Sequence, residues 1–310
     1  MRLVQTMQES EYAIESHGGP IAGSLTAPMG GTCPLVICAH GTGQHDRNEG
    51  VLHVFDAIAG ELAGHGVATY RFDKRGAGKT RGDYDALAYS DFYRDFEAIF
   101  DHFDRNRSDR FSHIIALGHS EGTMMAAELA TKRPVDGVVL LAPFIENMEK
   151  ILMDQAKRGE EAVVRMRGIG GMLTRLAVRL FGKPSDQQRK LIDRLKSTEG
   201  DTFRYRFQTF QARHMRELLA LDPEAIYRQV EVPALIIGGA KDAQCNPDDV
   251  GKIAGILGAR AEAHLLPDLS HLLRNDVGTG SFETYRDQLK RPVEHDVLRL
   301  ISGWIAQFGT

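Results

Sequence analysis

Residues 113–122 read His-Ile-Ile-Ala-Leu-Gly-His-Ser-Glu-Gly and are the most informative segment of the chain. The first five form an apolar run typical of a buried strand, and a helical pattern over 121–132 follows directly. The chain must therefore turn from strand to helix within a few residues. Gly118 and Gly122 let the two arms of such a turn pass closely, while Ser120 takes up strained backbone geometry. The Ser120 hydroxyl should then project beyond the strand, at the positive end of the following helix.

Strand and helix patterns alternate on both sides of this segment. The expected strands cover 35–39, 67–72, 113–117, 135–141, 234–237 and 261–266, and the expected helices cover 51–63, 90–104, 121–132, 248–258 and 293–307. Most of these strand runs are apolar throughout rather than alternating, as in parallel strands covered on both faces. An N-terminal hairpin is expected within 11–27. We therefore predict an α/β fold with a doubly wound, mostly parallel sheet and right-handed crossovers.

The alternation stops after Pro143, and residues 144–229 have a helical pattern without a strand run. We expect an α/β core built from residues 1–143 and 230–310, interrupted by a helical insertion at 144–229. Residues 150–216 hold 16 Lys and Arg against 7 Asp and Glu, a net charge of +9 in a chain whose total is −4. A solvated helical surface would explain this excess, and so would an electropositive cover that favours anionic substrates or a lipid surface.

The composition is that of an ordinary globular protein. Of the 310 residues 42% are apolar and 26% charged, which excludes a disordered chain and a disulfide-rich miniprotein. No apolar run is long enough to span a membrane, and the N-terminal residues lack the apolar segment of a secretory signal, so a cytoplasmic location is expected. Cys33, Cys38 and Cys245 have no metal-ligand spacing and are interpreted as buried thiols. Residues 73–80 only partly match a phosphate-binding loop, so nucleotide binding is not predicted. No His or Cys pair has metal-ligand spacing, so no metal is predicted either.

A serine hydroxyl becomes a nucleophile when a base accepts its proton and an acid orients that base. Asp242 comes just after the strand 234–237, and His271 comes just after the strand 261–266. The carboxyl ends of parallel strands share one edge of a sheet, so both should lie near Ser120. Ser120 is therefore the candidate nucleophile, His271 the candidate base and Asp242 the candidate acid.

Other titratable residues fit these roles less well. Glu146 follows the strand 135–141 and stays an alternative acid. His264 lies inside a strand and His295 on a helix, so neither should reach the edge. Asp248 and Asp249 follow a proline and are typical of helix-opening acids.

The loop after the first core strand reads His40-Gly41-Thr42-Gly43. Its glycines expose backbone N–H groups, which could stabilise an oxyanion together with the N–H of Glu121, the residue after the nucleophile. Thr42 is the preferred donor in this loop and Gly43 the alternative. The side chains of His40, His119 and Glu121 are expected to support the structure.

Taken together, these motifs make the chain similar to the serine α/β-hydrolases, within the dienelactone-hydrolase-like and serine-aminopeptidase-like branch that includes many bacterial esterases. The matching motifs are His40-Gly41-Thr42-Gly43 with Asp46-Arg47-Asn48-Glu49, Asp73-Lys74-Arg75-Gly76, Gly118-His119-Ser120-Glu121-Gly122, Asp242 with Pro247, and His271-Leu272-Leu273. The resemblance implies an α/β-hydrolase fold in which Ser120, His271 and Asp242 form the catalytic triad. It also implies oxyanion donors at Thr42 and Glu121, and a cap, or lid, at residues 144–229.

The activity implied by the resemblance is hydrolysis of carboxylic esters through an acyl-enzyme, without a cofactor. The same triad also serves thioesterases, peptidases, lactonases, acyltransferases and C–C hydrolases, and a non-catalytic binding protein on this fold is a further alternative. The expected partner is a small acyl substrate, with no nucleic acid. The oligomeric state is left open, a homodimer included. A Gly-rich loop at 276–285 departs from the family pattern and either shapes the acyl pocket or is mobile.

Overall fold

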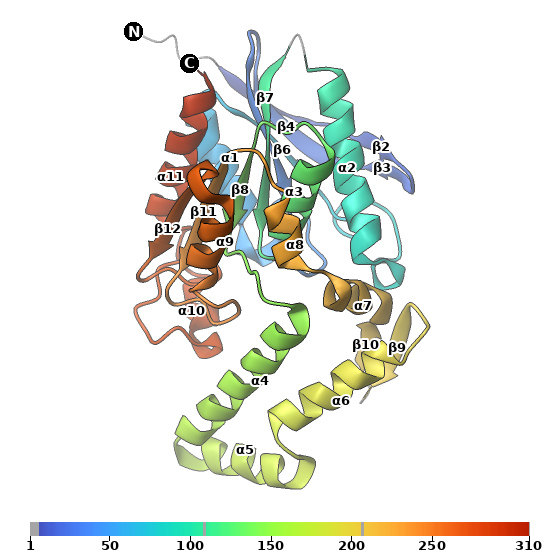
Figure 1. The fold of residues 1–310 in the computed structure, drawn as a ribbon, viewed down its shortest axis with the longest axis vertical. Helices are drawn as coiled ribbons and strands as arrows, with labels where there is room; N and C mark the ends of the chain where they lie inside the picture. Colours follow the sequence, from blue (N-terminus) through green and yellow to red (C-terminus); the bar gives the residue numbers. More distant parts are fainter. Residues whose placement is uncertain (1–5, 108–109, 206–207, 310) are drawn as a thin grey trace. The chain divides into compact units, whose positions relative to one another are not determined.

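The computed structural model describes residues 6–107, 110–205 and 208–309 (Figure 1). They divide into two compact units. The first unit takes in residues 1–84, 91–145 and 223–310, and the second takes in 85–90 and 146–222. Within the described ranges, no helix combines the length and the apolar character needed to cross a membrane.

The first unit is built on an eight-stranded sheet with the order β1-β4-β6-β5-β7-β8-β11-β12. The strands are β1 (Met7–Glu11), β4 (Gly23–Pro28), β6 (Ala68–Phe72), β5 (Cys33–Ala39), β7 (Phe111–His119), β8 (Gly137–Leu141), β11 (Ala234–Gly239) and β12 (Ala261–Leu266). The six strands from β6 to β12 are parallel, and β4 pairs antiparallel with β6 and with β1. The predicted doubly wound, mostly parallel sheet is therefore confirmed. The expected N-terminal hairpin pairs β2 (Ile14–Ser16) with β3 (Gly19–Ile21).

Helices cover both faces of this sheet. The helices of the first unit are α1 (Val54–Gly64), most of α2 (Tyr89–Arg105), α3 (Glu121–Lys132), α8 (Pro223–Arg228), α9 (Asp249–Leu257), α10 (Tyr285–Gln288) and α11 (His295–Ile305). On β5, Val36 and Cys38 pack in one apolar cluster with α1 and α11. Leu35 and Ile37 alternate with them and are also fully buried. Because both sets are covered, the strand is apolar at every position.

The second unit holds most of the predicted insertion. Its elements are α4 (Met148–Arg165), α5 (Gly168–Phe181), α6 (Pro184–Lys196), β9 (Thr202–Tyr205), β10 (Gln208–Gln211) and α7 (Ala212–Ala220). Local signals explain the helix ends: the Asn147 side chain accepts the N–H of Glu149 to begin α4, and Pro184 occupies the first turn of α6. Gly182, at φ 88°, follows α5 in a conformation that favours glycine.

Two expectations for residues 144–229 are wrong in detail. The segment contains a β-hairpin, since β9 and β10 pair antiparallel and the rings of Phe203 and Phe210 stack across it at 5.4 Å. Helix α8 belongs to the first unit, where it packs against α3 and α9 and buries Tyr227 completely. The second unit therefore ends at residue 222 rather than 229.

Candidate active site

Ser120 lies at the sharp turn between β7 and α3. Its backbone has φ 53° and ψ −120°, a conformation that L-residues rarely adopt and that costs about 1–3 kcal/mol. A Cβ atom on Gly118 would lie 2.1 Å from the carbonyl oxygen of Gly122, and one on Gly122 would lie 2.1 Å from that of Ala39. Both glycines are therefore needed for the close crossing, as the sequence predicts.

His271 bridges Ser120 and Asp242. Its Nε2 lies 3.0 Å from Ser120 Oγ, and its Nδ1 lies 2.7 Å from Asp242 Oδ2. The second carboxylate oxygen, Oδ1, accepts the backbone N–H groups of Gln244 and Cys245 at 2.7 and 2.8 Å. An ionised carboxylate can only accept, so Nδ1 carries the imidazole proton and Nε2 is free to accept the proton of Ser120. The structure thus brings together all three residues predicted for the triad.

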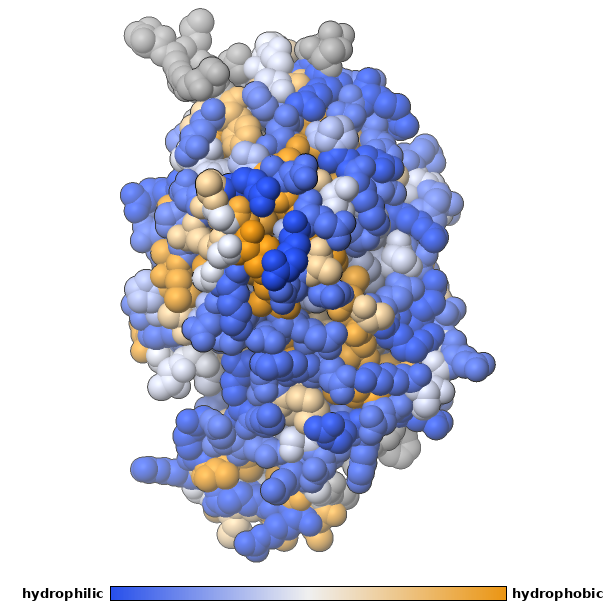
Figure 2. Space-filling view, in the orientation of Figure 1, coloured by the Kyte–Doolittle hydropathy of each residue, from blue (hydrophilic) through white to orange (hydrophobic). Residues whose placement is uncertain are grey.

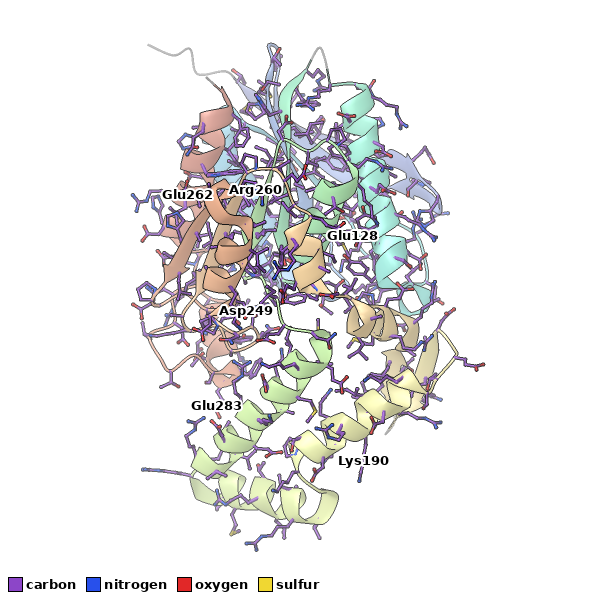
Figure 3. All side chains as sticks on the ribbon, viewed as in Figure 1. Glu128, Lys190, Asp249, Arg260, Glu262 and Glu283 are labelled. Carbon is purple, nitrogen blue, oxygen red and sulfur yellow. The ribbon has the colours of Figure 1, made fainter. Side chains whose placement is uncertain are left out.

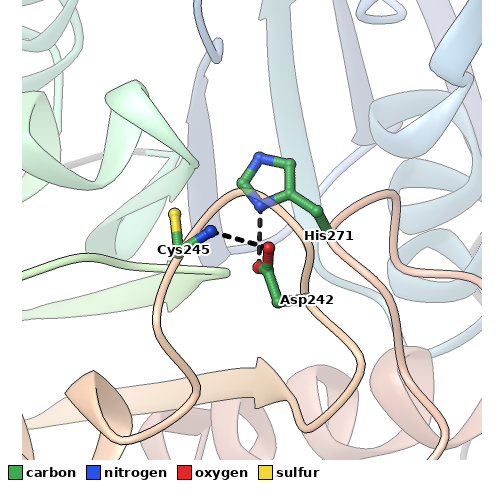
Figure 4. A group of neighbouring side chains, drawn as sticks. All are labelled: Asp242, Cys245 and His271. Carbon is green, nitrogen blue, oxygen red and sulfur yellow. Dashed lines mark hydrogen bonds and ion pairs between the residues drawn. The ribbon is translucent and has the colours of Figure 1, made fainter. Parts of the chain in front are cut away.

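Cys245 lies beside Asp242 and His271 (Figure 4). The sulfur, carboxylate and imidazole ligand atoms all lie within 4.8 Å of one another, a grouping that could hold a metal ion and that the sequence spacing does not reveal. Both carboxylate oxygens already accept hydrogen bonds, and the Nδ1 proton would have to leave before the imidazole could ligate there. The arrangement therefore fits an acid that orients a histidine.

The alternative acids and bases have other partners. Glu146 lies 3.5 Å from the Lys150 ammonium, and His264 on β12 hydrogen-bonds Glu262. Asp249 is fully buried at the start of α9, where it accepts the N–H of Ile145 and pairs with Lys252 (Figure 3). Among the described residues, Asp242 is the acid placed at the Nδ1 atom of His271.

The loop at residues 40–43 lies against the nucleophile. A Cβ atom on Gly41 would come within 3.3 Å of Ser120 Cβ. The N–H of Gly41 is already donated to Glu49 at 2.8 Å, so it is not free for a substrate. Thr42 Oγ1 donates to Glu121 Oε2 at 2.6 Å, which places the two predicted oxyanion residues side by side.

A buried ion pair between Glu49 and His119 supports this loop. Glu49 Oε1 lies 2.8 Å from His119 Nδ1, and both side chains are almost completely buried. His119 Nε2 lies 3.0 Å from the carbonyl oxygen of His271. Since both ring nitrogens face acceptors, both carry protons and His119 is a cation. The pair therefore links the loop carrying Gly41, the turn carrying Ser120 and the backbone of the base.

The pKa shifts of Glu49 and His119 agree with an ion pair between them. Burial opposes ionisation of Glu49, but His119 and the N–H of Gly41 outweigh it and lower the pKa of Glu49 to about 2. Burial would lower the pKa of His119, but the Glu49 carboxylate outweighs it and raises that pKa above 6.5. The sequence predicts a structural role for His119 but gives no role to Glu49, since the two residues are 70 positions apart.

Lys74 and His40 complete the support of the loop. The buried Lys74 ammonium donates to the carbonyl oxygen of Gly41 at 2.7 Å, and burial lowers the pKa of Lys74 against the opposite effect of Glu121. Burial and the nearby Lys74 charge lower the pKa of His40 to about 3, so its ring is neutral. His40 Nε2 lies 3.1 Å from the Asp46 carbonyl oxygen, which matches the supporting role expected for it.

The Gly-rich loop after the base is held by a single buried acid. Asp276 accepts the N–H groups of Gly278 and Gly280 at 2.8 and 3.0 Å. Its carbonyl oxygen accepts Lys241 Nζ at 2.6 Å, and Lys241 directly precedes Asp242. These contacts tie the loop to the segment that carries the candidate acid.

Comparison with known proteins now places the chain. The family model of the serine aminopeptidases, S33, matches residues 31–278, which is most of the sequence. The chain belongs to this family. It is thus a serine hydrolase with the α/β-hydrolase fold, and the predicted family branch is confirmed.

Esterases stand among the relatives of this S33 family member. Esterase EstD of Thermotoga maritima is 26% identical over 309 residues, covering 98% of this chain and 68% of that protein. The structure of Est1E from Butyrivibrio proteoclasticus with bound ferulic acid has a TM-score of 0.61 at 18% identity, covering 96% of this chain and 97% of that one. An esterase from Pyrococcus furiosus has a TM-score of 0.59 at 14% identity, covering 96% and 92%. At these identities the structural matches show a shared fold.

Proposed function

We propose that the protein hydrolyses carboxylic esters through an acyl-enzyme on Ser120. The observation that carries the proposal is the continuous hydrogen-bonded chain from Ser120 Oγ through His271 to Asp242, with distances of 3.0 and 2.7 Å. These three residues lie at the carboxyl ends of β7, β11 and β12, the edge where open α/β sheets bind ligands. The esterase relatives support an ester rather than another acyl substrate.

The reaction follows from the proton positions. Ser120 Oγ attacks the ester carbonyl carbon while its proton passes to Nε2 of His271, and Asp242 stabilises the resulting imidazolium. The tetrahedral oxyanion accepts the backbone N–H groups of Thr42 and Glu121. Collapse of this intermediate transfers the proton from Nε2 to the departing alcohol and leaves the acyl group on Ser120. Water then repeats the two steps, releasing the acid and restoring the serine.

Amide hydrolysis is the second candidate, because the matching family model is described by its aminopeptidases. The same triad would attack a peptide carbonyl, and His271 would protonate the departing amine. The two candidates make the same acyl-enzyme, so the leaving group distinguishes them.

We further propose that residues 146–222 of the second unit act as the cap that selects the acyl group. The support comes from connectivity: the backbone N–H of Ser120 donates to the carbonyl oxygen of Leu141, at the end of β8, and the chain enters the second unit five residues later. An insertion that starts beside the nucleophile can cover it at little cost in chain length.

The experiment is a substrate series with matched leaving groups. Purified protein is given p-nitrophenyl esters from acetate to palmitate and aminoacyl p-nitroanilides, each with the Ser120→Ala variant as control. We expect ester turnover that depends on chain length and disappears in the variant. Turnover of the anilides alone would favour the peptidase, and ester turnover that survives in the variant would rule out the serine mechanism.

A further inference from the structure

Helix α5 turns an apolar face toward solvent. Ile169, Leu173, Leu176 and Leu180 are 75, 56, 51 and 70% exposed. Their spacing of four, seven and eleven residues puts them on one side of the helix. The opposite side of the helix holds the buried Gly171. Figure 2 shows hydrophobic residues at the surface of the second unit.

The same stretch is strongly basic. Residues 162–185 contain Arg165, Arg167, Arg175, Arg179 and Lys183 and no Asp or Glu. At 100° per residue, Arg179 lies at one border of the exposed apolar face, about 60° from Leu176. Basic residues that border an apolar stripe are the pattern of helices that lie in the plane of a lipid surface.

A hollow opens beside this border. It has a volume of about 640 Å³ and is lined mainly by apolar side chains of α4 and α5. Val164, Met172 and Leu176 contribute apolar walls. Arg175, Arg179 and Lys183 also line it and outnumber its one acid, Glu160, which accepts the N–H of Ser185. Apolar walls next to cationic groups complement an amphiphile with a hydrocarbon chain and an anionic head.

We propose that α5 is an interfacial helix that docks the protein on anionic lipid bilayers. In this position Ile169, Leu173, Leu176 and Leu180 enter the boundary between headgroups and acyl chains, and the basic residues contact the lipid phosphates. A second copy of the chain is the less favourable occupant. A two-fold contact centred on this face would bring the Arg179 borders of both copies together without an acid in the stretch.

The test is co-sedimentation of the full chain with lipid vesicles. Vesicles of phosphatidylcholine alone are compared with vesicles containing about 30% phosphatidylglycerol, at low and at high salt. We expect binding to the anionic vesicles only, weakened by salt. Arg179→Gln should lower the partition coefficient about fivefold, the usual contribution of one basic residue at an anionic surface. Leu173→Ser with Leu180→Ser should lower it at least tenfold.

Matched control variants distinguish binding through this face from non-specific binding to vesicles. Leu265→Ser changes an apolar residue of β12 that is 47% exposed, and Arg299→Gln removes an exposed charge on α11; neither should alter sedimentation. Thermal unfolding of each variant verifies that the fold is kept. Equal binding to both vesicle types, or wild-type binding by the α5 variants, would overturn the proposal. So would a concentration-dependent dimer that the α5 variants disrupt while no vesicles are bound. None of these readouts uses ester turnover.

Discussion

Replacing Asp242 by Asn tests the orientation of the base. In the protein, Oδ1 accepts two backbone N–H groups and Oδ2 accepts Nδ1–H of His271. An amide at this position has one oxygen and one NH₂ group. If the NH₂ group pointed toward Gln244 and Cys245, the backbone N–H groups of these two residues would lose their acceptor. Each loss would destabilise the protein by about 1–3 kcal/mol. The amide oxygen therefore keeps those bonds, and the NH₂ faces His271.

The consequence is the wrong tautomer of the base. Facing an NH₂ donor, Nδ1 of His271 must accept a hydrogen bond, so the imidazole proton moves to Nε2. A protonated Nε2 can no longer accept the proton of Ser120. The corresponding change in a serine protease lowers kcat by about 10⁴, or roughly 5 kcal/mol of transition-state stabilisation. We expect a loss of the same order for Asp242→Asn in p-nitrophenyl acetate turnover at pH 8.

The controls are two carboxylates with other surroundings: Glu146 pairs with Lys150, and Asp248 is exposed before α9. Glu146→Gln and Asp248→Asn should each leave kcat/KM within about threefold of the original value, since surface substitutions rarely cost more than about 0.5 kcal/mol. Thermal unfolding of Asp242→Asn should shift little, because its backbone hydrogen bonds are kept. If Asp242→Asn retains a tenth of the activity, or if Glu146→Gln is the crippling change, the assignment of the acid is wrong.

Three further predictions concern the turn and its support. Ser120→Ala should lower kcat by about 10⁴–10⁶ with an unchanged circular dichroism spectrum; a residual tenth of activity would exclude this nucleophile. Gly122→Ala should unfold the protein several degrees earlier, because its Cβ would meet the Ala39 carbonyl at 2.1 Å, whereas Gly60→Ala on α1 meets open space and should be neutral or stabilising. Glu49→Gln should destabilise the protein most between about pH 4.5 and 6.5, where Glu49 and its partner histidine favour the folded state fully. The difference should shrink as pH rises through the raised histidine pKa or falls toward the Glu49 pKa of about 2, and a pH-independent difference would contradict the ion pair.

The parts of the structure that follow from local pattern could be predicted from the sequence. The turn at Ser120 needs only an apolar strand, two glycines and a helix in succession. Asp242 and His271 each follow a strand, so parallel pairing alone brings them to one edge.

Other features depend on contacts that sequence order does not reveal. Glu49 and His119 meet only because β5 and β7 are neighbours in the sheet. Helix α8 joins the first unit because Tyr227 is buried there, which its own pattern does not indicate. The strand β9 reads Thr-Phe-Arg-Tyr, without an apolar run, and is stabilised by pairing with β10.

Labelling with a fluorophosphonate tests the central claim most directly, because this reagent traps an activated serine without requiring the natural substrate. The protein is incubated with an equimolar probe, and the adduct is located by peptide mass spectrometry. We predict one label per chain on Ser120, and slow or absent labelling in His271→Ala. A protein that stays unlabelled, or that carries the label on another residue, would contradict the account of Ser120 as a nucleophile activated by His271.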